Sequence, residues 1–240
     1  MHAERHIYPN TETLAEAVAQ HLVTLCQRTH SERRPCTLAL AGGSTPRPAY
    51  EQLARPRFSE RIDWSRTHVF WGDERCVPPN DARSNYRMAR ETLLDHVPIP
   101  AENVHRLRGE LPPEEAAAQY EDELQAVFGD VRLPSFDLIL LGLGEDGHTA
   151  SLFPDTEALD VCDRRIVANY VPHLEAWRLT LTLPVINAAA NVVFIVSGVR
   201  KRSILQRVLA PEPETPPLPA QRVHPRDGRL IWLMDKGAAG

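Results

Sequence analysis

The sequence is poor in cysteine and lacks the cysteine spacings that mark metal or redox sites. Its four cysteines form no C-x-x-C pair and follow no regular spacing; they are Cys26, Cys36, Cys76 and Cys162. Zinc sites and disulfide frameworks both need cysteines at characteristic spacings. We therefore expect reduced thiols, with neither a zinc site nor a disulfide framework.

Long apolar runs are also missing. No segment approaches the roughly 20 consecutive apolar residues that span a bilayer. The first residues, MHAERHIYPNTETLAEAV, do not combine a basic segment, an apolar run and a small-residue cleavage site, which together mark a secretory signal. We expect a cytoplasmic protein without a membrane partner.

Excess basic charge is the third absence. The chain carries 27 Lys and Arg against 32 Asp and Glu, for a net charge of -5 and an isoelectric point near 6.1. Nucleic acids and anionic lipids are bound by concentrated basic surfaces. The charge balance therefore argues against a nucleic-acid partner, and any anionic ligand must be small and held locally.

The sequence does contain short apolar segments that alternate with helical patterns. Four of these segments are apolar on both faces of a strand, at residues 37–41, 67–71, 138–141 and 192–196. Such strands are typical of a parallel sheet that is covered by helices on each side. Helical patterns begin near Asn10 or Thr11 and near Pro113. We predict an α/β protein with an open, mostly parallel, doubly wound sheet and helices on both faces.

Three further strands are expected at residues 165–170, 179–183 and 230–234, the last closing the sheet. Residues 211–219, PEPETPPLP, cannot form a regular element because proline removes backbone donors and restricts the preceding residue. We interpret this segment as an exposed loop within one domain that spans residues 1–240.

Ligands of open α/β sheets bind outside the carboxyl ends of the strands, and three predicted strands run into polar loops there. The first loop reads LALAGGSTPRPAY. Gly43 permits close backbone approach, Ser44 and Thr45 supply hydroxyls, and free N–H groups at a helix start can bind a phosphate. A tight turn that caps the next helix is an equally good interpretation of this stretch alone.

The second loop reads VFWGDERCVPPNDARSNYRMA. An apolar strand delivers Asp73 and Arg75 to the same edge of the sheet, and Asn85 lies at a predicted helix start. Charged triplets are usually solvated surface. Because this triplet follows Phe70-Trp71-Gly72 directly, Arg75 is expected to point into a cleft.

The third loop lies in FDLILLGLGEDGHTASLFP and matches the G-x-G-x-x-G spacing of a dinucleotide-binding turn. Glu145 and Asp146 would place two carboxylates beside two phosphates, which is unfavourable in a partly desolvated site. A catalytic loop fits better, because His148 titrates near neutral pH and can take a proton from water, with Asp146 to orient it. A surface histidine in a turn is the alternative.

Together these segments resemble the 6-phosphogluconolactonase family, within the wider group that includes glucosamine-6-phosphate isomerase/deaminase. The resemblance extends from about Thr37 to Lys201. Beyond the loops described above, it includes Arg178 and the segments LPVINAA and GVRK. The family's pattern implies that Gly43 and Ser44 hold a 6-phosphate together with Arg178 and Lys201, which were expected at strand ends.

The resemblance also implies the reaction, hydrolysis of 6-phospho-D-glucono-1,5-lactone to 6-phosphogluconate without a cofactor or metal. In this interpretation His148 deprotonates the attacking water with Asp146 beside it, and Arg75 lies against the polar edge of the lactone. The remaining substrate-binding residues are expected to be Thr45, Asp73 and Asn85. We expect a monomer whose partner is this phosphorylated sugar lactone.

Two alternatives differ in specific residues. Amino sugar phosphate isomerases/deaminases use a further carboxylate soon after the loop histidine, whereas this chain has TASLFP there and no carboxylate before Asp155. They also have tyrosine where this chain has Arg75. A non-catalytic sugar-phosphate-binding protein could keep the Ser44 turn and lose the base, whereas this chain retains both Asp146 and His148.

Overall fold

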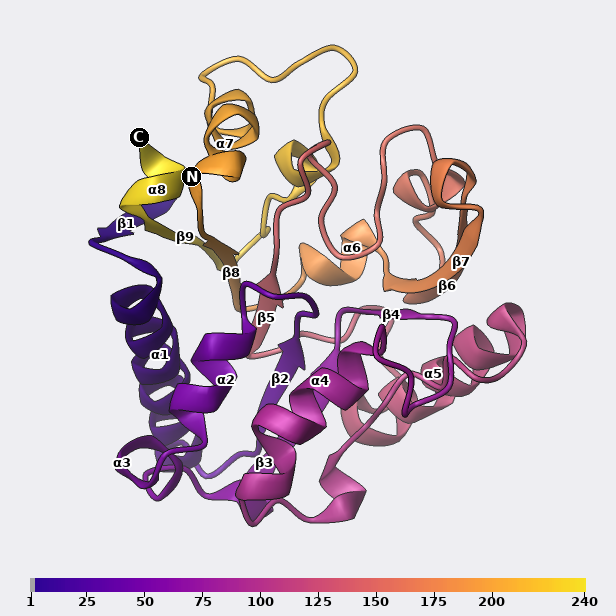
Figure 1. The fold of residues 1–240 in the computed structure, drawn as a ribbon. Coiled ribbons are helices and arrows are strands. Elements are labelled where there is room, and N and C mark those ends of the chain that lie inside the picture. The colour runs from indigo at the N-terminus through magenta and orange to yellow at the C-terminus, as the bar shows by residue number, and fades with distance from the viewer. Residues whose placement is uncertain (1–2) are drawn as a thin grey trace.

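A six-stranded parallel sheet forms the centre of the molecule in a computed structural model, which describes residues 3–240 (Figure 1). Every neighbouring pair in it is parallel. In spatial order the strands are β1 (Glu4–Tyr8), β9 (Arg229–Asp235), β8 (Asn191–Val196), β5 (Leu138–Leu141), β2 (Cys36–Leu40) and β3 (Thr67–Trp71).

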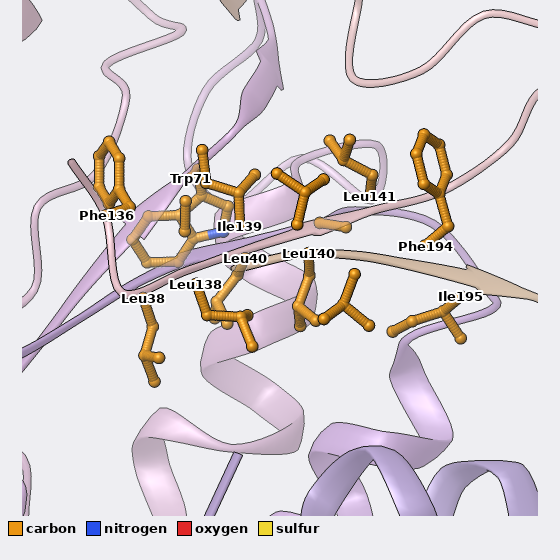
Figure 2. Packing of buried hydrophobic residues seen from close by; sticks show 14 of the residues in the cluster. Leu38, Leu40, Trp71, Phe136, Leu138, Ile139, Leu140, Leu141, Phe194 and Ile195 are labelled. Carbon is orange, nitrogen blue, oxygen red and sulfur yellow. The ribbon is translucent and has the colours of Figure 1, made fainter. Parts of the chain in front are cut away.

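The central strands are buried on both faces, as their apolar sequences predict. All residues of β2 and β5 are buried. Figure 2 shows Leu140 and Ile195 on one side of the strands and Leu141 and Phe194 on the other. Because successive side chains of a strand point to opposite faces, these short segments contribute to two core layers at once.

Helices cover both faces. α1 (Thr11–Ser31) begins after Asn10, whose side chain accepts a hydrogen bond from Thr13 N, and α5 (Pro113–Phe128) begins at the expected proline. α1, α2 and α4 lie side by side on one face (Figure 1), whereas Phe128 of α5 contacts Phe136 on the other. The doubly wound α/β prediction is confirmed. The remaining α-helices are α2 (Arg47–Leu53), α3 (Pro56–Ser59), α4 (Asn85–Thr92), α6 (Leu183–Ile186), α7 (Arg202–Val208) and α8 (Lys236–Ala239).

Short 3-10 helices occupy several connections. They are η1 (Trp64–Arg66), η2 (Leu94–His96), η3 (Ala101–Asn103), η4 (Glu157–Leu159), η5 (Pro172–Leu174), η6 (Val199–Lys201) and η7 (Pro219–Arg222). Residues 211–218 form no helix or strand, as the proline content predicts. Within residues 3–240, no helix is both long and apolar enough to cross a bilayer.

A separate three-stranded antiparallel sheet corrects two predictions. It consists of β4 (Asp73–Arg75), β7 (Ala176–Leu181) and β6 (Ile166–Val171), so the segments expected near 165–170 and 179–183 do not extend the main sheet. The prediction that the last strand closes the sheet is also wrong, because β1 lies outside β9 at the edge.

The strand order reverses between β2 and β5. From β2 the chain continues to β3 on one side, whereas β5, β8 and β9 follow one another on the other side. Loops diverge at such a switch point, and the crevice at the carboxyl ends of these strands is the usual ligand position. The turns after β2 and β5 therefore face a common hollow.

Two tyrosines hold the strand ends beside this hollow. Tyr50 O–H donates to the carbonyl of Ala41 at 2.8 Å and accepts from the Ala41 N–H at 3.0 Å. Tyr120 makes the same two contacts with Trp71, at 3.2 and 3.0 Å. Backbone groups that leave the sheet here are thus satisfied by buried side chains.

Candidate active site

A hollow of about 350 Å³ lies at the carboxyl ends of β2, β3, β5 and β8. Turns that follow these strands line it, and they are far apart in sequence. Most of the predicted site residues meet here: Gly43, Ser44, Thr45, Asp73, Arg75, Asn85, His148 and Lys201.

The turn after β2 forms one wall. Gly43 has φ of +93°, a left-handed conformation that favours glycine, and a Cβ there would meet open space. The side chain of Asn85 packs directly against Gly42, because a Cβ on Gly42 would lie 1.8 Å from Asn85 Oδ1. The turn therefore presents backbone and the Ser44 hydroxyl to the hollow, as an anion site requires.

Side chains of strand β4 alternate between its two faces, so Asp73 and Arg75 lie on the face toward the hollow and Glu74 lies on the other. Asp73 is buried and accepts hydrogen bonds from Ser151 Oγ at 2.7 Å and Asn85 Nδ2 at 3.3 Å. Arg75, two residues on, lines the hollow and donates to the carbonyl of Arg83 at 2.6 Å. Asp73 is thus held by side-chain donors, while the guanidinium of Arg75 is anchored to a backbone oxygen.

Glu74, between them, is a residue that the sequence did not single out. Its carboxylate accepts hydrogen bonds from Asn85 N at 2.7 Å, Tyr86 N at 2.8 Å and Ser84 Oγ at 3.0 Å. Burial raises the pKa of Glu74, although these backbone donors oppose the shift. The carboxylate ties β4 to the first turn of α4 and thereby places Asn85 in the hollow. Only the three-dimensional pairing reveals this role.

The loop after β5 carries a histidine–carboxylate pair. Asp146 Oδ1 lies 2.5 Å from His148 Nδ1 and 3.1 Å from His148 N. Burial would raise the pKa of Asp146, but the hydrogen bond and charge of His148 outweigh it and lower the pKa to about 2. Asp146 is therefore an acceptor at neutral pH, and Nδ1 carries the proton. Nε2 is left as the nitrogen that can take a proton from water.

Two glycines make this loop possible. A Cβ on Gly144 would lie 2.1 Å from His148 Nδ1 and 2.6 Å from Asp146 Oδ1, so any side chain there would displace the pair. Gly147 has φ of +84° and packs against Leu218, at the end of the proline-rich loop. Gly144 thus serves close packing around the imidazole, and Gly147 serves a left-handed turn packed on Leu218, rather than the dinucleotide that their spacing resembles.

Lys201 approaches from the turn after β8. It lines the same hollow as Ser44 and His148. Burial lowers the pKa of Lys201, whereas the Glu145 carboxylate favours its charged form. Arg200 also lines the hollow but is exposed, and its Nε lies 3.8 Å from Glu145 Oε1.

Asp146 and Arg178 line a second hollow of about 360 Å³, which adjoins the first and shares Arg75 and His148 with it. Arg178 was expected at a strand end, but it lies inside β7, directly opposite Arg75 of β4. Burial and the nearby Arg75 charge lower the pKa of Arg178. The structure therefore brings Arg178 to the His148 end of the site and not to the Ser44 turn.

The chemistry that this arrangement supports follows from its parts. A cation and a glycine-serine turn at one end suit a phosphate. An oriented imidazole in the middle suits general-base catalysis. Two guanidinium groups beyond it suit an oxygen that develops negative charge.

Comparisons with known proteins agree with this description. Residues 9–232 match the family model described as glucosamine-6-phosphate isomerases/6-phosphogluconolactonase. The chain is 46% identical over 233 residues to a 6-phosphogluconolactonase of Synechocystis, with 95% of this chain and 94% of the relative covered. It is 37% identical to a 6-phosphogluconolactonase of Haemophilus influenzae over 96% of both chains. The solved 6-phosphogluconolactonase structure from Trypanosoma brucei superposes with a TM-score of 0.85 at 30% identity, covering 99% of this chain and 98% of the other.

Proposed function

The chain belongs to the glucosamine-6-phosphate isomerase/6-phosphogluconolactonase family, and we propose that it hydrolyses 6-phospho-D-glucono-1,5-lactone to 6-phospho-D-gluconate. This is the second step of the oxidative pentose phosphate pathway. The observation that carries the proposal is the meeting of the Ser44 turn, Lys201 and His148, which is hydrogen-bonded to Asp146, around one hollow.

In the proposed mechanism His148 acts as general base. Nε2 takes a proton from water as the water oxygen bonds to C1 of the lactone. The bond between C1 and the ring oxygen then breaks, and the imidazolium returns the proton to that oxygen. Asp146 keeps Nδ1 protonated and stabilises the positive imidazolium between these steps.

Gly43, Ser44, Thr45 and Lys201 are proposed to hold the phosphate. Support comes from Gly43, whose left-handed conformation leaves open space beside the turn, and from Lys201, which lines the same hollow. Asp73 and Asn85 are proposed to bind sugar hydroxyls. A charge-assisted hydrogen bond to phosphate orients the ring so that C1 lies at His148.

Arg75 is proposed to stabilise the oxyanion that forms at the lactone carbonyl. It faces Arg178 across β4 and β7, and like charges directly opposite each other repel. An anion near the pair relieves this repulsion, so both arginines favour negative charge near C1. The position of Arg178 supports this role more than the 6-phosphate contact that the family pattern implies.

Isomerisation or deamination of an amino sugar phosphate is not favoured. The segment after His148 runs through Thr149, which donates to Gly142 O at 2.8 Å, and Ser151, which donates to Asp73. No carboxylate occurs in this segment before Asp155, whereas ring opening in the isomerases uses one.

A direct assay tests the function. Acid release from freshly generated 6-phosphogluconolactone is followed by pH-stat, with subtraction of spontaneous hydrolysis, and glucosamine 6-phosphate serves as the control substrate. We expect acceleration with the lactone only. Turnover of glucosamine 6-phosphate, or no acceleration with the lactone, contradicts the proposal.

We further propose that the enzyme acts in the cytoplasm as a monomer comprising one domain. The support is that a single chain supplies every element of the described hollow, and that its net charge is -5. Light scattering after size-exclusion chromatography is expected to give a mass near 27.0 kDa, and a multiple of this mass contradicts the monomer.

A further inference from the structure

Phe153 lies against the catalytic imidazole. Its ring stacks on His148 with a centroid distance of 4.0 Å and an interplanar angle of 29°. Phe153 is only 5% exposed, yet among the described residues the contiguous hydrophobic core includes its neighbour Leu152 and not Phe153. A large aromatic ring is therefore buried against the active site rather than in the core.

Buried polar groups fix the backbone on which this ring is mounted. The carbonyl of Phe153 accepts from Thr156 Oγ1 at 2.8 Å, and Asn169 Nδ2 donates to Thr156 Oγ1 at 3.1 Å. The same Asn169 amide donates to Ser151 O at 2.9 Å, while Ser151 Oγ is bound to Asp73. Because both sides of Phe153 are anchored, the ring forms a rigid support.

The two contacts of the imidazole constrain it in different ways. The hydrogen bond to Asp146 fixes one edge of the ring but still allows the ring plane to tilt about that bond. Stacking on Phe153 fixes the plane and hence the direction of Nε2. The face of an aromatic ring is also electron-rich, so it attracts the imidazolium more strongly than the neutral imidazole.

We propose that Phe153 is a positioning residue for lactone hydrolysis, which holds the His148 plane toward the attacking water and stabilises the imidazolium formed when Nε2 takes the proton. The proposal rests on the function given above. It adds an aromatic contact that acts only through His148.

Other charged groups near His148 contribute to its protonation in every variant. Asp146 and Glu145 belong to its own loop, and the remaining groups come from β4, η5, β7 and η6. They are Asp73, Arg75, His173, Arg178, Arg200 and Lys201. His173 also touches the edge of Phe153, with centroids 5.4 Å apart. These groups are unchanged when Phe153 alone is replaced, so differences between variants report on the ring.

The test compares Phe153→Leu with Phe153→Tyr. The leucine variant keeps an apolar side chain and loses the aromatic face, whereas the tyrosine variant keeps the face. For Phe153→Leu we expect a fall in kcat of about ten-fold with KM changed by less than about two-fold. The acidic limb of its kcat/KM profile is expected to move to lower pH, because the less stabilised imidazolium releases its proton more readily. Phe153→Tyr is expected to retain kcat and the wild-type profile.

Phe58→Leu is the matched control, because Phe58 in α3 is 6% exposed and its loss also removes a buried ring. It is expected to leave kcat unchanged. Thermal unfolding monitors folding of each variant, and Phe153→Met replaces the leucine variant if the latter does not fold.

Three outcomes overturn the proposal: unchanged kcat in a folded leucine or methionine variant, a change in KM alone, or a tyrosine variant as slow as the leucine variant. The wild-type rate separates this inference from the function on which it rests. A wild-type protein that does not accelerate lactone hydrolysis removes the function itself. An active wild type with an equally active Phe153→Leu variant removes only the role of Phe153.

Discussion

The two sheets of the molecule contribute to the site in different ways. The parallel sheet supplies Ser44, His148 and Lys201 from turns after its strands end, where glycines allow sharp bends. The antiparallel sheet supplies Asp73, Arg75 and Arg178 from within β4 and β7, where the strand register fixes the side chains. The first group depends on turn geometry, and the second depends on strand pairing.

The largest effect is expected for His148→Ala, which tests whether the turns of the parallel sheet carry the chemistry. If the parallel-sheet turns carry the chemistry, kcat falls by about 10²–10⁴-fold while KM changes little, because phosphate contacts remain. Steady-state kinetics with correction for spontaneous hydrolysis measure this. Retained turnover would remove His148 as the base.

The importance of turn geometry is tested by comparing Gly144→Ala with Gly142→Ala. The new methyl group at 144 would lie 2.1 Å from His148 Nδ1, whereas a Cβ at 142 has no neighbour within 4 Å. Misplacement of the imidazole by about 1 Å is expected to lower kcat about 10²-fold for Gly144→Ala. Gly142→Ala should stay close to the wild-type rate. Equal rates in the two variants would show that close packing at 144 does not position the base.

The contributions of the two cationic residues are compared by Lys201→Ala and Arg178→Ala. Lys201 shares its hollow with the Ser44 turn, so its loss is expected to raise KM about 10- to 100-fold. Arg178 lies opposite Arg75, and both are proposed to act near C1 of the lactone, so its loss is expected to lower kcat more than it raises KM. The reverse pattern would indicate that Arg178 binds the phosphate, as the family resemblance implies.

The smallest effect concerns the pH dependence of stability. The pKa of Asp146 is about 2 in the folded protein against an ordinary value of 3.8. A lowered pKa contributes stability that is present above the unfolded value and is lost as pH falls through the folded value. The difference in Tm between the wild type and Asp146→Asn should therefore shrink as pH falls from about 4 toward 2. A difference that does not vary with pH contradicts this.

The same division explains what could be predicted from the sequence. The central strands of the parallel sheet are recognisable because local residues bury both faces, and the turns after them combine glycine with reactive side chains. β1 was missed because its sequence, ERHIY, is polar and its middle residues are exposed at the edge of the sheet.

Long-range strand pairing accounts for the other differences between the sequence prediction and the structure. The sequence predicts a loop for the DER segment, with Arg75 pointing into a cleft, whereas in the structure this segment is a strand in which Arg75 pairs with Arg178, about a hundred residues later in the chain. Arg178 was expected at a strand end because the predicted strand starts at Leu179, whereas β7 begins at Ala176. The role of Glu74 could not be predicted, because it depends on the N–H groups of Asn85 and Tyr86 in α4.

The hydroxyls of Tyr50 and Tyr120 have a thermodynamic consequence. Each hydroxyl satisfies the backbone N–H and carbonyl at the end of a strand beside the crevice. These strand ends are therefore ordered without a bound substrate. Binding of the sugar phosphate therefore costs little backbone entropy at these strand ends, and this favours its affinity. Removing either oxygen, as in Tyr50→Phe, is expected to weaken substrate affinity from a position that no substrate touches.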